Sequence, residues 1–530
     1  MQRRSLFAAP LLGVLPLSLA RPALAQGTAS AARTLRFVPQ SDLSSIDPLW
    51  SVATVSVTHG YMVWDTLFGL DAALQPRPQM CESAELSDDG LTWTFTLRPG
   101  LLFHDNEPVR PADCIVSLQR YMQKDPFMQA LGSLVLETSP LDDRRWTMRL
   151  SKPFRQTLFA IALRNVFIMP ERIARTPPAT QFKEVIGSGP YRFLPDEWQA
   201  GAHAGYARFD RYVPRTEPPV LFTGGKVANF DKVDWIVQPD PATAAAALQR
   251  GEVDLVERPL LDLVPMLRRS PGIRTAELDT FGALGMLRFN QLQPPFDNPK
   301  LRRALLPGLD QSEVVAAAVG DMKEFGTNPV GFFSAGSPMA TLDGLEELTG
   351  KRDMARAMQL VAESGYKGER VVMVAPSDLP QIMAMSQVVQ DQLQRMGLNI
   401  DFQPTDWGTM LSRLTKREPV GQGGWSCFCV TWAGLSVATP GSSYPLRGNG
   451  TAAWNGWPTD PKLEALREQW LDAVDIPAAQ AVCGEMQRQA MQSLPFIPLG
   501  QWTQPAAFTE QVRGLLPSPF MLFWNASKTG

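Results

Sequence analysis

Alternating polar and apolar positions predict a strand early in the chain. Residues 92–97 alternate threonine with large apolar side chains, the period-two pattern of a strand whose two faces differ. Pro99-Gly100 predicts a turn, and residues 101–103 predict a second short strand, so a hairpin is expected here. Residues 110–121 are predicted to form a helix, because Pro111 would fall in its first turn, where proline is tolerated.

Further along the chain, strand patterns alternate with helix patterns. Strands are predicted at 233–237 and 251–256 with an alanine-rich helix between them, and at 371–375 and 398–402 with a longer helix between them. A strand–helix–strand order predicts parallel pairing of the two strands. The chain is therefore expected to have an α/β fold.

Several strings of residues point to a family. The stretch 91–121, LTWTFTLRPGLLFHDNEPVRPADCIVSLQRY, closely resembles the "YTFTLRxGVKFHDGxPxxAxDVxxS" stretch of extracytoplasmic solute-binding proteins of the dipeptide/oligopeptide/nickel family. Residues 187–191 resemble the family's "GTGPY", residues 284–297 its "lxfNxxxpPF", and residues 495–499 its "xPxiPL". The resemblance implies a two-lobe periplasmic-binding-protein fold that captures a small solute or a peptide-like ligand in a cleft and delivers it to the membrane permease of an ABC importer.

The resemblance and the order of elements together predict a division of the chain. Lobe I is expected at 33–280, with an inserted subdomain at about 66–185, and lobe II at 281–496. The tail, 497–530, is expected to return to lobe I. The strands near Asn290 and Pro498 are expected to form the hinge about which the lobes close on a ligand.

Composition and charge narrow the function further. The 530 residues exceed what one hydrophobic core usually organises, so two or three packed units are expected. A net charge of −3 gives no basic footprint for nucleic acid. The three histidines are scattered and no metal or cofactor motif is present, so neither a metal nor a cofactor is expected. The five cysteines leave at least one free thiol, and most are expected to be buried as small hydrophobic side chains.

The N-terminus has the pattern of a signal peptide over residues 1–25. Arg3-Arg4 precedes an apolar run at 6–20, and Ala23-Leu24-Ala25 matches an A-x-A cleavage site. No later stretch is apolar over the length that spans a bilayer. The mature protein is expected to be a periplasmic monomer, exported by the general secretory route or, given the loose twin-arginine match, by the Tat route.

Aromatic residues gather in the segment 419–459. It contains Trp425 and Trp432 among six large aromatic residues, lacks aspartate and glutamate, and has Arg447 as its one charge. Tryptophan with glycine and serine between suits a ligand-binding surface, and a core strand at 425–432 is the alternative. Trp432 is the first choice for a ligand contact, since seven residues separate the two tryptophans and an ideal strand would turn them to opposite faces.

A departure from the family bears on the ligand. Peptide-binding members carry "gWxaDyxdP", whose aspartate meets the ammonium group of the ligand, whereas here Gly434 and Leu435 follow Trp432-Ala433 and Leu435 takes the place of the acid. The resemblance therefore implies that a neutral, anionic or amine-blocked ligand is preferred, because an unpaired buried ammonium is costly. Arg447 would pair with an anionic ligand.

Other residues complete the set of candidates. Asp42 or Asp47 of lobe I would substitute for the missing acid if a free amine does bind. Asn290, at the predicted hinge, is included among the ligand-binding candidates.

Two other functions are compatible with an exported α/β protein. A secreted hydrolase lacks support, because the chain has no H-E-x-x-H, G-x-S-x-G or P-loop motif and its literal S-x-x-K at 364–367 falls at a predicted helix end. The protein is therefore not expected to be an enzyme. A solute receptor for chemosensing has the same sequence features as a transport receptor.

Overall fold

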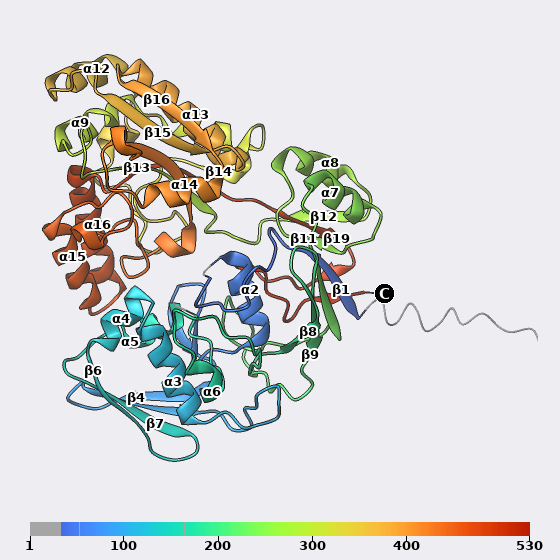
Figure 1. Cartoon of the computed structure of the whole chain (residues 1–530). Coiled ribbons are helices and arrows are strands. Elements are labelled where there is room, and N and C mark those ends of the chain that lie inside the picture. The colour runs from blue at the N-terminus through green and yellow to red at the C-terminus, as the bar shows by residue number, and fades with distance from the viewer. Residues whose placement is uncertain (1–32, 52, 164, 530) are drawn as a thin grey trace, which may run out of the picture.

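Two mixed sheets organise the chain, and each is the centre of one lobe in the computed structural model, which describes residues 33–51, 53–163 and 165–529 (Figure 1). We call the lobe with the seven-stranded sheet lobe I and the lobe with the six-stranded sheet lobe II. Figure 1 shows lobe II above the inserted part of lobe I, with the helices α4 and α5 of lobe I close below α15 of lobe II.

The sheet of lobe I is built from both ends of the chain. Its order is β12 (Ile273–Ala276), β19 (Ala506–Thr509), β11 (Leu255–Val256), β1 (Thr34–Val38), β10 (Lys232–Ile236), β9 (His203–Arg208) and β8 (Tyr191–Gln199). β1 lies between β10 and β11 and runs parallel to both. β10 and β11 run in the same direction, as predicted, but they do not pair with each other because β1 lies between them.

The sheet of lobe II carries the aromatic segment. Its order is β14 (Gly326–Thr327), β18 (Ile497–Trp502), β13 (Ala283–Phe289), β17 (Cys427–Ala433), β15 (Arg370–Pro376) and β16 (Asn399–Thr405). β15 is parallel to β16, as predicted. β13 pairs antiparallel with β17 on one side and with β18 on the other.

The inserted part of lobe I has its own four-stranded sheet. Its order is β4 (Cys81–Leu86), β5 (Thr92–Leu97), β7 (Arg145–Leu150) and β6 (Val135–Pro140). Two separate two-stranded sheets pair β2 (Phe68–Leu70) with β3 (Pro76–Pro78) and, in the tail, β20 (Val512–Arg513) with β21 (Ser527–Lys528). The strand predicted at 92–97 is confirmed, but the predicted hairpin with 101–103 is wrong. Both edges of β5 are taken by β4 and β7, and Leu102 makes only an isolated bridge to Pro108.

Helices cover the sheets of each lobe. Those of lobe I are α2 (Thr54–Val63), α3 (Pro111–Met122), α4 (Pro126–Gly132), α5 (Thr157–Leu163), α6 (Glu171–Ala174), α7 (Pro241–Gln249) and α8 (Val264–Arg269). Those of lobe II are α9 (Pro299–Ala304), α10 (Gln311–Val319), α11 (Glu346–Thr349), α12 (Met354–Glu363), α13 (Pro380–Arg395), α14 (Trp407–Leu414), α15 (Pro461–Leu471) and α16 (Ile476–Ser493). Within the described part of the chain, no helix is both long enough and apolar enough to cross a membrane.

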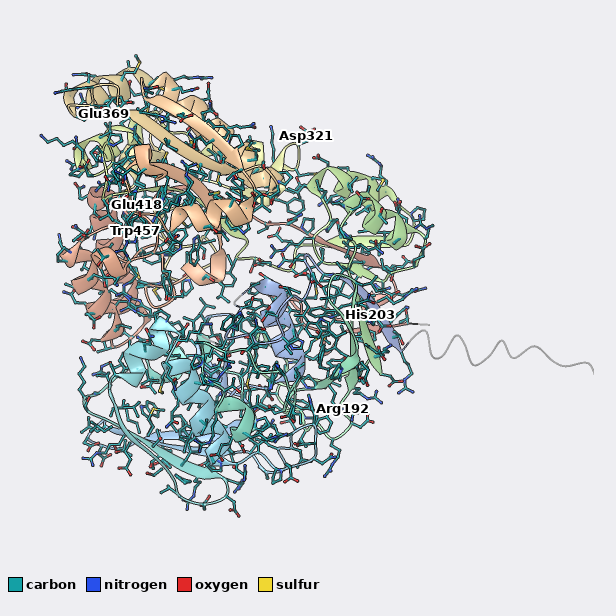
Figure 2. All side chains as sticks on the ribbon, in the orientation of Figure 1. Arg192, His203, Asp321, Glu369, Glu418 and Trp457 are labelled. Carbon is teal, nitrogen blue, oxygen red and sulfur yellow. The ribbon has the colours of Figure 1, made fainter. Side chains whose placement is uncertain are left out.

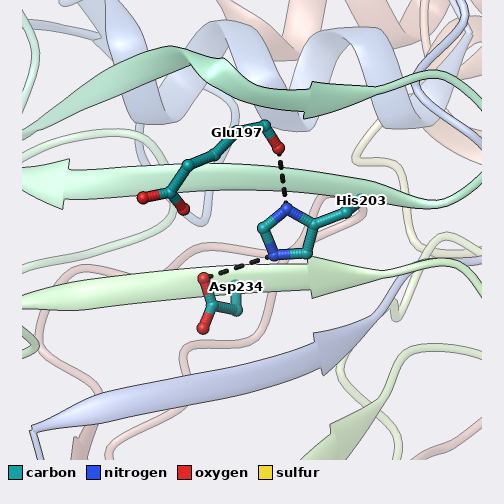
Figure 3. Close-up of side chains that lie close together, drawn as sticks. All are labelled: Glu197, His203 and Asp234. Carbon is teal, nitrogen blue, oxygen red and sulfur yellow. Dashed lines mark hydrogen bonds and ion pairs between the residues drawn. The ribbon is translucent and has the colours of Figure 1, made fainter.

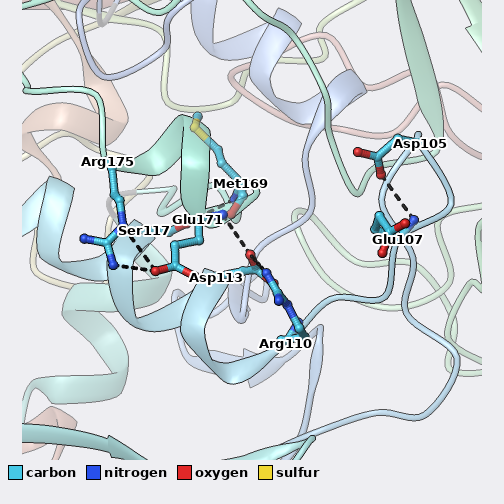
Figure 4. Close-up of polar contacts among 8 residues, drawn as sticks. All are labelled: Asp105, Glu107, Arg110, Asp113, Ser117, Met169, Glu171 and Arg175. Atoms are coloured by element: carbon cyan, nitrogen blue, oxygen red, sulfur yellow. Dashed lines mark hydrogen bonds and ion pairs between the residues drawn. The ribbon is translucent and has the colours of Figure 1, made fainter.

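The stretch that carries the strongest family resemblance is a scaffold rather than a site. The buried carboxylate of Asp113 accepts the backbone N–H groups of Arg110 at 2.8 Å and Glu171 at 2.7 Å, so it caps α3 and ties it to α6 (Figure 4). Asp105 accepts the N–H of Glu107 at 3.2 Å, which makes the predicted polar turn (Figure 4). Asp113 and Asp105 are thus used for helix capping and for a turn.

Residues 187–191, the second string that resembles the family, pack against the stretch 91–121. The N–H of His104 donates to the carbonyl of Gly187 at 2.8 Å, and a Cβ at Gly187 would lie 1.7 Å from the carbonyl oxygen of Val63. Only glycine permits this approach. The two strings therefore belong to one packing unit.

Two segments cross between the lobes. β12 and β13 are joined by residues 277–282, and β18 and β19 by residues 503–505. Asn290 and Pro498, expected at the hinge, instead lie within lobe II: Asn290 donates its amide to the carbonyl of Trp425 at 3.1 Å, and Pro498 is in β18. The return of the tail to lobe I accordingly follows residue 502 rather than 496, whereas the other domain limits stay predictions.

Candidate ligand-binding site

A cavity of about 80 Å³, here called the inner cavity, lies between the lobes beside the end of β17. Lobe II contributes Leu435 and Ser436, and the other lining residues come from lobe I and the tail. The apolar lining is Pro48, Leu49, Val57, Leu163, Phe167, Leu435 and Phe520. Because the two lobes share the wall, any ligand that fills this cavity contacts both of them.

The polar groups of the inner cavity are mainly uncharged. Tyr121 and Asn165 line it, and burial raises the pKa of Tyr121, so its hydroxyl stays protonated. The hydroxyl of Tyr61 donates to the side-chain oxygen of Asn165, which fixes the orientation of the amide. Asp125, the one described acid in the lining, accepts the N–H groups of Phe127 and Met128 at 3.0 Å and so caps α4.

Neither of the two acids proposed as substitutes for the family's aspartate lines the inner cavity. Asp47 is fully buried and accepts two hydrogen bonds from Arg120, at 2.6 and 3.2 Å. Its charge is therefore already compensated, and the predicted role for a ligand ammonium is not supported. Asp42 is half-buried and is not among the residues that line the inner cavity.

Gly434 places Leu435 at the cavity. Gly434 begins a short 3₁₀ turn, Gly434–Val437, and its N–H donates to the carbonyl of Gly282 at 2.7 Å. A Cβ at this position would lie 2.0 Å from the carbonyl oxygen of Phe281, so any other residue would push the turn away from the crossing segment. Gly434 therefore has a positioning role, and Leu435, 6% exposed, forms part of the wall.

The aromatic residues of 419–459 form one connected cluster rather than two opposed faces. Successive ring centroids are 5.0–6.5 Å apart along the series Trp457, Trp425, Phe428, Trp454, Trp432 and Tyr444. Trp457, labelled in Figure 2, lies at one end of this series in lobe II. Trp425 comes before β17, so strand alternation does not apply to it.

The two candidate tryptophans differ in burial. Trp425 is fully buried, so it is a core residue and its predicted ligand contact is not supported. Trp432 is partly exposed at the other end of the cluster, where its ring stacks on Tyr444 at 15°. Trp432 lies three residues before Leu435 but is not itself in the lining of the inner cavity.

A buried arginine anchors the aromatic cluster. Arg288 on β13 is fully buried and donates to four backbone carbonyls, those of Pro445, Trp454, Asn455 and Pro495, at 2.5–2.9 Å. No carboxylate of the described chain pairs with it, and burial lowers its pKa to about 9. The guanidinium also lies over the ring of Trp454, 5.0 Å from the centroid.

Arg447 and Asn290, the other predicted polar ligand contacts, form hydrogen bonds within lobe II. Arg447 donates to both oxygens of Glu464 on α15, at 2.7–3.0 Å, so its charge is already paired and an anionic ligand would have to compete for it. Asn290 is fully buried, and its backbone N–H donates to the carbonyl of Ser426 at 2.8 Å. Neither residue lines the inner cavity.

Two further groups of polar residues have local structural explanations. Glu197, His203 and Asp234 come together on the sheet of lobe I (Figure 3), but the amine of Lys232 lies 2.8 Å from Glu197 and 3.0 Å from Asp234 and forms an ion pair with each acid. The hydroxyl of Ser364 donates to the carbonyl of Val361 at 2.6 Å, as expected at a helix end. All five cysteines are buried, as predicted for most of them, and none forms a disulfide.

Comparison with known proteins now gives the family. The family model described as bacterial extracellular solute-binding proteins, family 5, matches residues 75–454. The chain belongs to this family. A relative from Sinorhizobium fredii, "Probable peptide ABC transporter periplasmic-binding protein y4tO", is 38% identical over 99% of each chain.

Solved structures of family 5 proteins share the two-lobed fold. A complex of AgaA from A. tumefaciens with agropinic acid aligns with a TM-score of 0.75 at 21% identity, covering 94% of this chain and 99% of the other. A dipeptide-binding protein from Pseudoalteromonas with bound Met-Leu aligns with a TM-score of 0.77 at 19% identity, covering 94% and 100%. The fold is therefore shared between proteins that bind chemically different ligands, and it does not by itself determine the ligand.

Several residues of the inner cavity carry no signal in the sequence. Asn165, Phe167 and Phe520 are distant from β17 in the chain and belong to no matched string. They meet Leu435 only because the crossing segments bring the lobes and the tail together.

Proposed function

We propose that the protein is the periplasmic peptide-binding component of an ABC importer and that its ligand binds between the lobes, with one small uncharged group in the inner cavity of about 80 Å³. The observation that carries this proposal is the shared wall, with Leu435 and Ser436 from one lobe facing Leu49 and Phe167 from the other. A ligand that contacts both lobes favours the closed arrangement, and the permease would recognise that arrangement. The peptide specificity named for the S. fredii relative agrees with this role.

The ligand presents an uncharged group to Leu435. The nearby acids are committed to other partners, Asp47 to Arg120 and Asp125 to the N-terminus of α4. An ammonium buried beside Leu435 would lose its hydration without gaining a carboxylate, which costs several kcal/mol. An amine-blocked or otherwise uncharged peptide-like compound therefore fits the cavity better than a peptide with a free amine.

Calorimetric titration of the mature protein with matched N-acetylated and free dipeptides tests this function. The acetylated member of each pair should bind at least tenfold more tightly, since about 1.4 kcal/mol corresponds to a factor of ten. Leu435→Asp should improve binding of the free amine at least tenfold relative to Leu435→Asn, which has nearly the same shape without the charge. Equal affinities for both members of each pair, in all three proteins, would remove Leu435 from the site.

The proposal also covers export, the oligomeric state and the identity of the ligand. The predicted signal peptide, residues 1–25, lies outside the described residues, and a periplasmic monomer that begins at Gln26 is proposed from the cleavage motif. Sedimentation of the secreted protein, with N-terminal sequencing, tests both points. Mass spectrometry of the solute that co-purifies would name the ligand.

The proposal assigns no catalytic role. Relatives of the family are named as binding proteins, and Ser364 of the S-x-x-K string is used in a helix cap. A hydrolysis screen on peptide and ester substrates, with Ser364→Ala as the control, should show no turnover that depends on Ser364. Loss of solute uptake on deletion of the gene would separate transport from chemosensing.

A further inference from the structure

Asn165 is an uncharged polar residue in the wall of the inner cavity. The other polar side chains that the described residues contribute to this wall are those of Tyr121, Asp125 and Ser436. The hydroxyl of Tyr121 is enclosed by the protein, so the ring of Tyr121 faces the cavity, and Asp125 caps α4. Asn165 from lobe I and Ser436 from lobe II are therefore the side chains left to meet a polar group of a ligand.

The backbone conformation explains why asparagine is tolerated at position 165. Asn165 follows α5 with a φ of 50°, in the left-handed region that asparagine adopts more readily than most residues. Such a residue commonly ends a helix. The helix end accounts for the backbone of Asn165 but does not fix its side chain, which has a partner of its own.

Tyr61 holds the side-chain oxygen of Asn165. The ring of Tyr61, on α2, is 1% exposed and stacks on the ring of Phe222, with the centroids 4.8 Å and the planes 10° apart. Burial raises the pKa of Tyr61, so its hydroxyl stays protonated and donates to the oxygen of Asn165. Tyr61 does not line the inner cavity, so the amide oxygen points away from the cavity and the NH₂ group is turned towards it. No acceptor within the described chain takes a hydrogen bond from this NH₂ group.

The size and the lining of the inner cavity suit a small acyl group. Liquid water occupies about 30 Å³ per molecule, so the cavity of about 80 Å³ has room for a group of about three non-hydrogen atoms, such as an acetyl group. The methyl of such a group would contact the apolar wall that Leu49, Phe167 and Leu435 form. An amide NH₂ group donates hydrogen bonds and does not accept them, so Asn165 favours a carbonyl oxygen over an ammonium group.

We propose that Asn165 anchors the ligand by donating a hydrogen bond to the carbonyl oxygen of an acyl group in the inner cavity. Tyr61 is the positioning residue, because it holds the amide oxygen and thereby turns the NH₂ group towards the ligand. The proposal rests on the function proposed above and names the uncharged group, so that the ligand is an N-acylated peptide-like compound.

Two probes of nearly the same shape test this hydrogen bond. N-acetyl-dialanine and N-thioacetyl-dialanine are titrated calorimetrically into the mature protein, and the wild type should bind the acetyl probe more tightly because sulfur is the weaker acceptor. Asn165→Leu replaces the amide by an apolar group of similar shape. It should lower the ratio of the two affinities about fivefold, as expected for one net hydrogen bond between uncharged groups.

Asn106→Leu is the matched control. Asn106 also has a positive φ, of 71°, but it is exposed and lies outside the lining of the inner cavity. Because sulfur is also larger than oxygen, the measured quantity is the change in the affinity ratio between proteins, and the control should keep the wild-type ratio.

Two further variants separate positioning from contact. Tyr61→Phe keeps the amide of Asn165 but removes the hydroxyl that orients it, so the ratio should fall although the donor is still present. Asn165→Asp keeps the shape of the side chain and suits the left-handed backbone. It should lower the ratio and should bind free dialanine more tightly than the wild type does, because the ammonium gains a carboxylate.

Unfolding curves show which variants are folded, and Asn165→Asp carries the test if Asn165→Leu does not fold. The anchor is overturned, and the peptide-binding function stands, if the wild type binds both probes equally or if the folded variants at position 165 keep the wild-type ratio. Loss of the discrimination in Ser436→Ala but not in those variants would assign the donor to Ser436 and would equally overturn it. If the wild type binds neither probe, the proposed function fails and the anchor fails with it.

Discussion

Replacement of Arg288 by methionine should destabilise lobe II and loosen the aromatic cluster. The methionine keeps an apolar stem in the core but removes the donors that four buried backbone carbonyls now share. Three of these carbonyls belong to the segment 445–455, which carries Trp454 onto Trp432. The variant therefore tests whether the segment is held in place from β13.

Two opposing terms set the magnitude. A buried carbonyl that loses its partner costs about 1–3 kcal/mol, so four of them at about 2 kcal/mol each cost about 8 kcal/mol. Against this, the variant no longer buries a charge: the pKa of Arg288 falls from 12.5 to about 9, and at about 1.4 kcal/mol per unit this relieves about 5 kcal/mol. The net loss in the free energy of unfolding is expected to be about 3 kcal/mol.

Urea unfolding measures this loss, with Arg447→Met as the control. Arg447 lies in the same segment but forms a partly exposed ion pair with Glu464, and loss of such a pair should cost about 1 kcal/mol or less. Proteolysis within 445–455 should also become faster in Arg288→Met alone. If Arg288→Met is as stable as Arg447→Met, the reasoning is refuted, because water or a backbone shift would then satisfy the hydrogen bonding of the four carbonyls.

Four more outcomes are expected. We expect the part of the ligand outside the inner cavity to contact the partly exposed ring of Trp432, so Trp432→Ala should weaken ligand binding by about 1–3 kcal/mol and leave folding cooperative. Trp425→Ala should instead cost about 3–5 kcal/mol of stability, because that ring is fully buried; normal binding by Trp432→Ala would place Trp432 outside the site. Burial lowers the pKa of His59 from 6.5 to about 3, so on acidification the unfolded state takes up the proton first. The free energy of unfolding should therefore decrease as the pH is lowered from about 6.5 to 3, by up to about 1.4 kcal/mol per pH unit. His59→Gln should flatten this dependence in a pH series of unfolding curves, and an unchanged slope would contradict the assignment. Asp47→Asn should cost about 3–5 kcal/mol, because it leaves the buried Arg120 without its charge partner, and thermal unfolding checks this. Small-angle scattering should show compaction when a verified ligand saturates the protein, and an unchanged radius of gyration would count against lobe closure.

The sequence by itself determined the local elements and the family. Period-two alternation identified β5, and strand–helix–strand order predicted the parallel pair of β15 and β16, because both signals lie within single elements and in their order along the chain. The strings at 91–121 and 187–191 carried the family resemblance, and the structure shows that they contact each other through the His104 N–H and the Gly187 carbonyl.

The tertiary structure alone decided which candidates face the cavity. Trp425 and Trp432 are equivalent as letters, yet one is in the core and the other partly exposed, since burial depends on the loop that folds over β17. The sequence also could not show which charged residues pair with each other. Asp47 pairs with Arg120, 73 positions away, and Arg447 pairs with Glu464, 17 positions away. Pairing of this kind is a property of packing, which no local pattern records.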